Sequence, residues 1–375
     1  MNNEKRLSSE KSRQLTKLLT ITKTANMQAL MGFSELAKII SLVAMDIGKG
    51  KEMACAFPKA WPRIAPQKDY YSTTIDWFMS PDSTITSFDV VDMLDKGNLL
   101  DQDFMTYLMC LTELHKRRRK YGLILQRQPL PTMVQVSPRA LMEYGPDFPP
   151  EALASWLTWR KFFYDLDNRA AQETGYLFEP ILAAAIGGEP KSARERVVRR
   201  ADDPMKGRQV DCWKVLPDGT PLAYELKLRV TIAASGQGRF SEELSFARDC
   251  RSSGVKPILV VLDPTENNKL TELQAAYRAV GGAAYIGDAA WNHLEEEAGA
   301  TMASFIDRYV RLPVISVSKF EEELDGNNPN RYSLLKTLQA KLEGNELKIS
   351  LGQHQRCIER HEDLYLAADE EDSQE

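Results

Sequence analysis

The segment from Leu222 to Ile232 constrains the fold most, because it reads as a strand that carries charge on one face. Side chains alternate between the two faces of a strand, so Glu225 and Lys227 share one face. Tyr224 and Leu226 take the opposite face, which we expect to meet the core. Two opposite charges on an otherwise apolar strand are costly to desolvate unless each has a partner. The strand therefore predicts a polar site beside the core.

A second carboxylate precedes this strand. Pro217-Asp-Gly219 predicts a turn between the strand and an earlier one over 209–216. The hairpin would bring Asp211 within reach of Glu225. Two carboxylates beside a lysine suit Mg²⁺, which prefers oxygen ligands and retains waters. The sequence therefore predicts a magnesium site at Asp211 and Glu225, with Lys227 next to it.

The surrounding pattern predicts an α/β fold of the α+β kind, in which helices flank a mixed central sheet. The expected helices cover 151–187, 241–252, 270–280 and 289–310, and the expected strands cover 196–200, 209–216, 222–232, 257–262 and 283–286. Their order, α-β-β-β-α-β-α-β-α, is typical of a mixed sheet covered by helices.

Three regions follow from this reading. Residues 1–150 are expected to be mostly helical, with helices within 9–57 and over 101–120, and to supply scaffold, dimer or DNA contacts. Residues 151–312 would form the catalytic core. Residues 313–375 would form a C-terminal extension that ends in an acidic tail.

Two other acidic-x-Lys triplets compete with Glu225-x-Lys227. Glu189-Pro-Lys191 has proline where a central strand would need a hydrogen-bond donor. Glu346-Leu-Lys348 follows Gly344-Asn345 and could form a hairpin, but it lacks a nearby carboxylate strand before it and a helix–strand unit after it. The plain alternative for Glu225 and Lys227 is a solvated ion pair on a surface strand.

In this order of elements, Asp211…Glu225-x-Lys227 resembles the PD-(D/E)xK nuclease superfamily over roughly residues 165–290. The signature proline is absent, since Gln209-Val210 precede Asp211. The resemblance implies that Asp211 and Glu225 coordinate Mg²⁺, and that Lys227 positions and helps to deprotonate the attacking water. The family often adds a glutamate from the preceding helix, and Glu179 fits that place; a solvent-facing helix residue is the alternative.

Size and the absence of a helicase or ATPase module make the chain similar to type II restriction endonucleases, and more particularly to the ApaLI-like group. This resemblance implies Mg²⁺-dependent hydrolysis of double-stranded DNA at a short palindromic site, by a cytoplasmic homodimer of a prokaryotic restriction-modification system. One alternative is a repair or junction-resolving nuclease of the same fold. Another is a non-catalytic DNA-binding protein that retains the fold.

Cationic clusters are the candidate DNA contacts. The run from His115 to Lys120 contains Arg117, Arg118 and Arg119, and a second cluster beside the proposed site contains Arg199 and Arg200. Gln237 and Arg239 are residue types suited to reading adenine and guanine edges. The alternatives are a helix end whose cations the dipole favours, and a glycine turn that leads into a helix.

The formal net charge of −5 would argue against DNA if it were spread evenly. Residues 359–375 hold eight acids and one arginine, which leaves residues 1–358 with a net charge of +2. The absence of GxxxxGK[ST] and of a complete GxGxxG argues against a nucleotide cofactor. The sequence has neither an 18-residue apolar stretch nor a signal-peptide pattern, so it does not predict association with a membrane.

Overall fold

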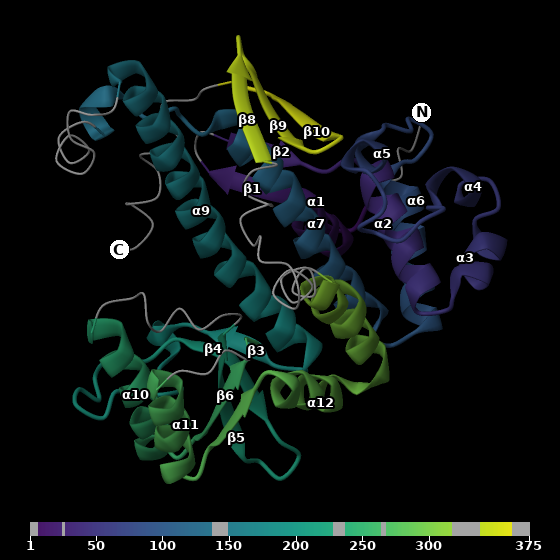
Figure 1. Ribbon diagram of the computed structural model, residues 1–375. Helices are drawn as coiled ribbons and strands as arrows, with labels where there is room; N and C mark the ends of the chain where they lie inside the picture. Colours follow the sequence, from purple (N-terminus) through teal and green to yellow (C-terminus); the bar gives the residue numbers. More distant parts are fainter. Residues whose placement is uncertain are drawn as a thin grey trace, which may run out of the picture.

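The computed structural model describes residues 7–24, 27–136, 149–227, 237–263, 268–316 and 338–361. A helical N-terminal body, a five-stranded sheet flanked by helices and a small sheet near the C-terminus make up this part of the chain (Figure 1). The predicted fold class, a mixed sheet flanked by helices with a largely helical N-terminal region, is confirmed.

The N-terminal body is built around α2, whose residues are buried along almost its whole length, including Leu36, Ile40 and Val43. The expected helical pattern over 9–57 is interrupted by an antiparallel hairpin, β1–β2, which the apolar spacing did not indicate. The elements of the body are α1 (Ser9–Leu19), β1 (Thr20–Thr24), β2 (Met27–Leu30), α2 (Phe33–Asp46), α3 (Gly50–Ala56), α4 (Trp61–Ile64), α5 (Ile75–Met79), α6 (Ser87–Leu100) and α7 (Phe104–Arg127).

The five-stranded sheet has the order β3-β4-β5-β6-β7. The first three strands pair antiparallel and the last three pair parallel, so the sheet is mixed, as the sequence predicted. Its strands are β3 (Glu189–Lys191), β4 (Val210–Val215), β5 (Pro221–Lys227), β6 (Lys256–Val261) and β7 (Ala283–Ile286).

The expected strand over 196–200 was wrong. The edge strand is β3, Glu189–Lys191, and a short 3-10 turn at Ala193–Glu195 follows it. Arg196 then adopts a left-handed backbone conformation (φ 54°), and only an isolated bridge joins Arg199 to Gly207. A proline is tolerated in β3 because an edge strand needs ladder donors on one side only.

Helices cover both faces of this sheet. Tyr224 and Leu226 point into the same apolar cluster as the N-terminal helices, which confirms their expected core face. Ala223 lies in the cluster on the other face, where α10 and α11 pack. Figure 1 shows α10 and α11 on one side of the sheet and α12 on the other. The bounds are α10 (Gln237–Ser252), α11 (Asn268–Ala279), α12 (Asp288–Ile306) and η3, a π-helical segment (Asp307–Arg311).

The long helix α9 (Pro150–Ala185) connects the two halves of the molecule (Figure 1). It contains Pro180 and ends where Gly188 passes close to β4. A Cβ atom at Gly188 would lie 2.3 Å from the Cys212 Sγ atom, so only glycine allows this approach. The close approach brings the last turns of α9 to the strand that carries Asp211.

The small sheet near the C-terminus has the order β10-β9-β8 and consists of β8 (Leu338–Glu343), β9 (Glu346–Leu351) and β10 (His354–Glu359). Leu347 and Ile358 pack on Phe162 of α9 and on Ile124 of α7. The buried Arg360 donates a hydrogen bond to the Leu125 carbonyl oxygen (3.0 Å). The extension is therefore docked on the helices, while the acidic tail lies beyond residue 361, outside the described residues.

No helix in the described ranges is both long enough and apolar enough to cross a membrane.

Candidate active site

Asp211 and Glu225 stand on neighbouring antiparallel strands. The pairing of Cys212 with Tyr224, extended by one residue, brings Asp211 opposite Glu225 on the same face of the sheet. The Leu226 amide donates a hydrogen bond to the Asp211 Oδ2 atom (2.9 Å), which fixes this carboxylate against β5. The hairpin thus brings together the two carboxylates that the sequence predicted would meet.

Lys227 lies between two carboxylates. Its Nζ atom is 3.0 Å from Oε1 of Glu225 and 3.1 Å from Oε1 of Glu243 on α10. Burial lowers the pKa of Lys227, but the charges of Glu225 and Glu243 outweigh burial and raise that pKa above its ordinary value. The lysine is therefore held as an ammonium cation.

Glu179 of α9 joins the same electrostatic cluster. Burial, and then the charge of Glu225, raise the pKa of Glu179 to about 7, against a partial offset from Lys227. Burial, Glu225 and Glu179 together also raise the pKa of Asp211 well above its usual range. The structure therefore brings Asp211, Glu225, Lys227 and Glu179 into one group, as the sequence predicted, although their chemical roles stay predictions.

Glu243 is a member of the cluster that sequence reasoning missed. It follows the strand by 16 residues and lies in the helix expected over 241–252, among other acids of similar appearance. Its Oε2 atom is buried and has no hydrogen-bond partner among the residues with described placement. Only the tertiary packing of α10 on β5 distinguishes Glu243 from its neighbour Glu242.

The residues of this cluster suit a hard cation. No group of three or more His, Cys, Asp or Glu side chains in the described ranges is arranged closely enough to form a metal cage by itself. Mg²⁺ does not need such a cage, because it is usually held by one or two carboxylates together with water and phosphate oxygens. Burial, and then the neighbouring carboxylates, raise the pKa of both Asp211 and Glu179, and a divalent cation would offset this cost of holding ionised carboxylates together.

The basic run on α7 points largely into the protein. Arg119 Nη1 contacts both carboxylate oxygens of the buried Glu35, at 2.6 and 2.7 Å. Arg118 donates to the carbonyl oxygens of Tyr70 (3.3 Å) and Thr73 (3.0 Å). The guanidinium of Arg117 lies 5.7 Å from the centre of the Tyr121 ring. These contacts favour structural roles for Arg118 and Arg119, and their contact with DNA stays a prediction.

The second predicted set of DNA contacts lies around the loop before β4. The Arg199 side chain is exposed, whereas Arg200 contacts Glu242 at 3.1 Å. Gln237 and Arg239 belong to the first turn of α10, but their side chains lie outside the described residues.

The rival triplet is in a different setting. Glu346 and Lys348 lie in β9 of the small sheet. This strand forms an antiparallel hairpin with β8, as the sequence allowed. Lys348 pairs with Glu343 at 2.6 Å and with Glu346 at 3.4 Å, and neither Glu346 nor Glu343 is buried. The rival triplet is therefore a solvated surface pair.

The mixed sheet and the carboxylate–lysine cluster agree with the nuclease class that the sequence predicted, and comparisons with known proteins show the family. The model of the ApaLI-like restriction endonuclease family matches residues 50–311, more than half of the chain, so the chain belongs to this family. It is 80% identical, over the full length of both chains, to the type II restriction enzyme ApaLI of Acetobacter pasteurianus. No solved structure matches. The chain is a restriction endonuclease, and site-specific DNA cleavage is the activity of its class.

Proposed function

We propose that the chain hydrolyses phosphodiester bonds of double-stranded DNA at a short palindromic site in a Mg²⁺-dependent reaction, with Asp211, Glu225 and Lys227 as its catalytic residues. One observation carries this proposal: Asp211, one residue before the β4–β5 pair of Cys212 with Tyr224, accepts a hydrogen bond from the Leu226 amide (2.9 Å), and Lys227 contacts Glu225 at 3.0 Å. The strong likeness to a type II restriction enzyme supports the choice of substrate.

Asp211 and Glu225 are the residues that would hold Mg²⁺, with Glu179 beside them. When bound, the ion would polarise the phosphate and lower the pKa of a water molecule. The hydrogen bond from the Leu226 amide orients Asp211 for this task. Asp211 and Glu225 lie on the two strands of one hairpin, so the geometry of the sheet sets their separation.

Lys227 acts through its positive charge. Because Glu225 and Glu243 raise its pKa, Lys227 is protonated at neutral pH and is poorly suited to remove a proton from water. Its ammonium group can donate hydrogen bonds to the attacking water and to the phosphate oxygen on which negative charge develops. We therefore assign it water orientation and charge stabilisation.

Plasmid cleavage tests these roles. Wild-type protein with Mg²⁺ should give discrete fragments, and EDTA, Glu225→Gln or Lys227→Met should each abolish them. The matched controls are Glu346→Gln and Lys348→Met in the rival surface triplet, which should cleave like the wild type. Loss of cleavage in the controls but not in the site variants would overturn the assignment. A smear would contradict cleavage at a specific site, and no cleavage of any plasmid would contradict the proposed Mg²⁺-dependent reaction.

We also propose that the enzyme works as a homodimer. The described residues contain one such carboxylate–lysine cluster, whereas a duplex presents two strands of opposite polarity. A two-fold dimer supplies a second site in matching symmetry. Heterodimers of wild-type and Glu225→Gln protomers, separated by different tags, should nick one strand and leave open circles. Full linearisation by such heterodimers in a single binding event would contradict the dimer proposal.

A further inference from the structure

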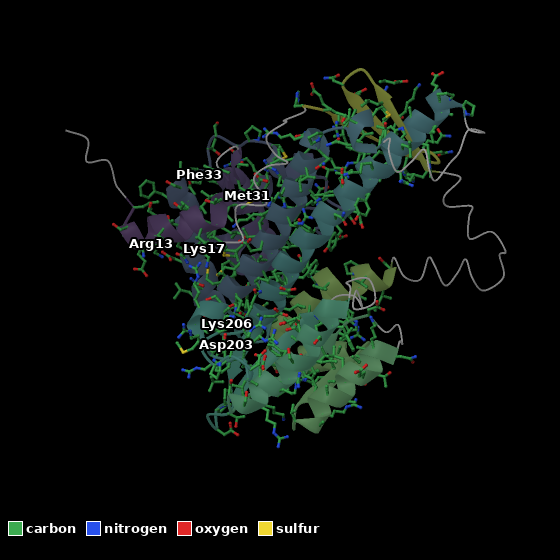
Figure 2. The ribbon with its side chains drawn as sticks, turned by 90° about the vertical axis from the view of Figure 1, so that its left-hand side faces the viewer. Arg13, Lys17, Met31, Phe33, Asp203 and Lys206 are labelled. Carbon is green, nitrogen blue, oxygen red and sulfur yellow. The ribbon has the colours of Figure 1, made fainter. Side chains whose placement is uncertain are left out.

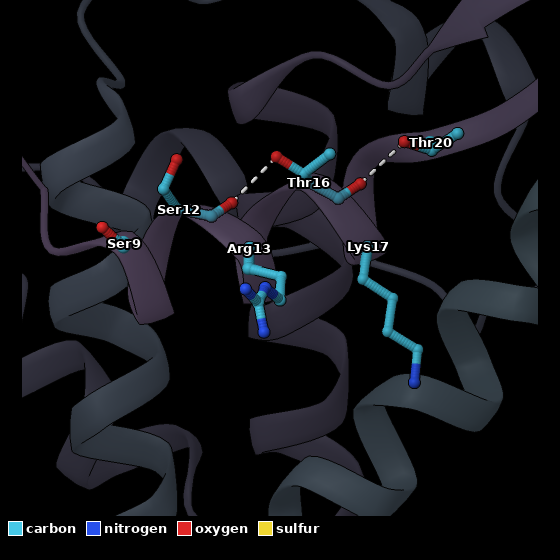
Figure 3. A pocket seen from close by; sticks show the side chains of 6 residues that line it. All are labelled: Ser9, Ser12, Arg13, Thr16, Lys17 and Thr20. Carbon is cyan, nitrogen blue, oxygen red and sulfur yellow. Dashed lines mark hydrogen bonds between the residues drawn. The ribbon is translucent and has the colours of Figure 1, made fainter.

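A hollow on one face of α1 is lined by hydroxyl groups and cations, and no acid is among its lining residues. It has a volume of about 670 Å³ and is lined by Ser9, Ser12, Arg13, Thr16, Lys17 and Thr20. Figure 3 shows the four hydroxyl-bearing residues in a row along the helix, with Arg13 and Lys17 extending side by side below that row. The six residues recur at helical spacing, so this face is a continuous strip.

The two cations of this strip have no partner in the part of the chain that the structure describes. Arg13 and Lys17 are exposed, and neither takes part in an ion pair or a side-chain hydrogen bond there. By contrast, Lys11 on another side of the same helix is paired with Asp95. Ion pairing therefore neutralises one cation of α1 and leaves two available on the face with the hydroxyl groups.

The strip has the shape and chemistry of a phosphate-binding surface. Arg13 and Lys17 are four residues apart, which is about 6 Å along a helix and suits successive contacts along one strand. The hydroxyl-bearing side chains are short, so a ligand backbone can approach closely. Thr16 and Thr20 donate to main-chain oxygens of their own helix, both at 2.8 Å, which keeps these side chains low on its surface.

The position of the strip relates it to the candidate active site. Figure 2 shows Arg13 and Lys17 on the same side of the molecule as Asp203 and Lys206. These two residues belong to the loop that leads into β4 and Asp211. The strip is also fixed to the rest of the protein, because Lys116 of α7 donates a hydrogen bond to the Lys17 carbonyl oxygen (2.8 Å).

We propose that the Ser9–Thr20 face of α1 binds the sugar–phosphate backbone of duplex DNA, with Arg13 and Lys17 each neutralising a phosphate. The contact positions the duplex on the enzyme without reading its sequence. This inference depends on DNA as the substrate and not on the roles of Asp211, Glu225 or Lys227. It adds a basic surface to the N-terminal body besides the run from His115 to Lys120, whose Arg118 and Arg119 make contacts within the protein.

Salt-dependent DNA binding tests the proposal. The probe is a fluorescein-labelled 30-base-pair duplex, titrated by anisotropy in EDTA so that cleavage plays no part. Each lost phosphate contact reduces the slope of log K against log salt by about 1. The Arg13→Ala/Lys17→Ala variant should therefore reduce the slope by about 2, equally for duplexes of unrelated sequence.

A matched control has the same loss of charge elsewhere. Lys59→Ala/Lys68→Ala removes two exposed cations near α4, and should leave the slope unchanged. The melting temperature of both variants should equal that of the wild type, because surface substitutions without partners rarely change stability. A slope for Arg13→Ala/Lys17→Ala equal to that of the wild type or the control would overturn the proposal, as would a wild-type protein that does not bind the duplex. Loss of cleavage with normal binding in Glu225→Gln would leave it intact.

Discussion

The ammonium of Lys227 lies 3.1 Å from a carboxylate oxygen of Glu243, a residue that no sequence motif marked. This contact ties the charged strand β5 to α10 at the centre of the candidate active site. It also gives Lys227 a second negative neighbour besides Glu225, and the two together fix the position of its charge.

Removing the charge of Glu243 should therefore impair catalysis without abolishing metal binding. In Glu243→Gln the pKa of Lys227 falls, because burial is then opposed by Glu225 alone. We expect kcat to fall on the order of 10-fold and the alkaline limb of the pH–rate profile to begin at lower pH. Glu242→Gln is the control, because Glu242 contacts Arg200 and Arg208 and not Lys227. Superimposable profiles of Glu243→Gln and the wild type would contradict this expectation.

The raised pKa of Glu179 predicts a pH-dependent stability. A carboxyl group whose folded pKa lies near 7, above its unfolded value, binds more protons in the folded state. Its ionisation therefore costs stability as pH rises through 7. In metal-free protein, Glu179→Gln should raise the melting temperature clearly at pH 8 and much less at pH 5, because the cost builds up between the unfolded pKa of 4.5 and the folded pKa of about 7. Added Mg²⁺ should reduce the difference in melting temperature between Glu179→Gln and the wild type at pH 8. The cation neutralises the other carboxylates of the cluster, whose charge makes ionisation of Glu179 costly in the wild type. An equal shift at both pH values would point to packing instead of charge.

Arg119 offers a test that separates folding from DNA binding. Glu35 is almost completely buried, and it pairs with Arg119 and with His115 Nε2 (2.9 Å). Removing one partner of a buried ion pair typically costs about 3–5 kcal/mol. Arg119→Ala should lower the free energy of unfolding by roughly this amount in urea denaturation. A lower affinity for DNA with unchanged stability would restore the sequence-based expectation that Arg119 contacts the phosphates. Arg199→Ala, at an exposed arginine, is the reference for a variant without a stability cost.

Asp46 connects the N-terminal body to the end of α12. Its carboxylate accepts hydrogen bonds from Tyr107 (3.2 Å) and Tyr309, and it pairs with Arg308. Burial raises the pKa of Asp46 in spite of these partners. Tyr309→Phe should lower the free energy of unfolding by about 1.5–3 kcal/mol, the usual contribution of a hydrogen bond to a charged group. Tyr71→Phe, which removes a bond to the Tyr309 main-chain oxygen instead, should cost less. Equal losses in the two variants would contradict a special role for the carboxylate.

The local pattern of the sequence was sufficient to predict the hairpin that carries Asp211, Glu225 and Lys227. Strand alternation and one turn decide which side chains share a face, and both operate over about 15 residues. The same pattern could not find Glu243, because its place depends on how α10 packs across the sheet. It also placed the edge strand wrongly, since β3 contains a proline that central strands exclude but edges allow.

The pattern of charged residues in the sequence was sufficient to find the Glu225–Lys227 motif, but it could not show which basic residues face solvent. The run from His115 to Lys120 looks like an exposed basic patch, yet His115 is fully buried and Arg119 reaches inward to Glu35. Glu35, the partner of Arg119, lies 84 residues earlier in the chain, so the local sequence around Arg119 does not indicate this ion pair. The strip on α1 was overlooked for the opposite reason: its two cations are spread among serines and threonines and form no run.

The length of α9 sets the separation between two parts of the molecule. Phe162, in the first half of this helix, packs against the small C-terminal sheet, and Glu179, near the end of the helix, joins the carboxylate cluster. Seventeen residues of helix separate the two, a rise of about 26 Å. The helix therefore fixes the spacing between the small sheet and the carboxylate cluster, and a deletion or insertion of residues within α9 would change that spacing by about 1.5 Å per residue.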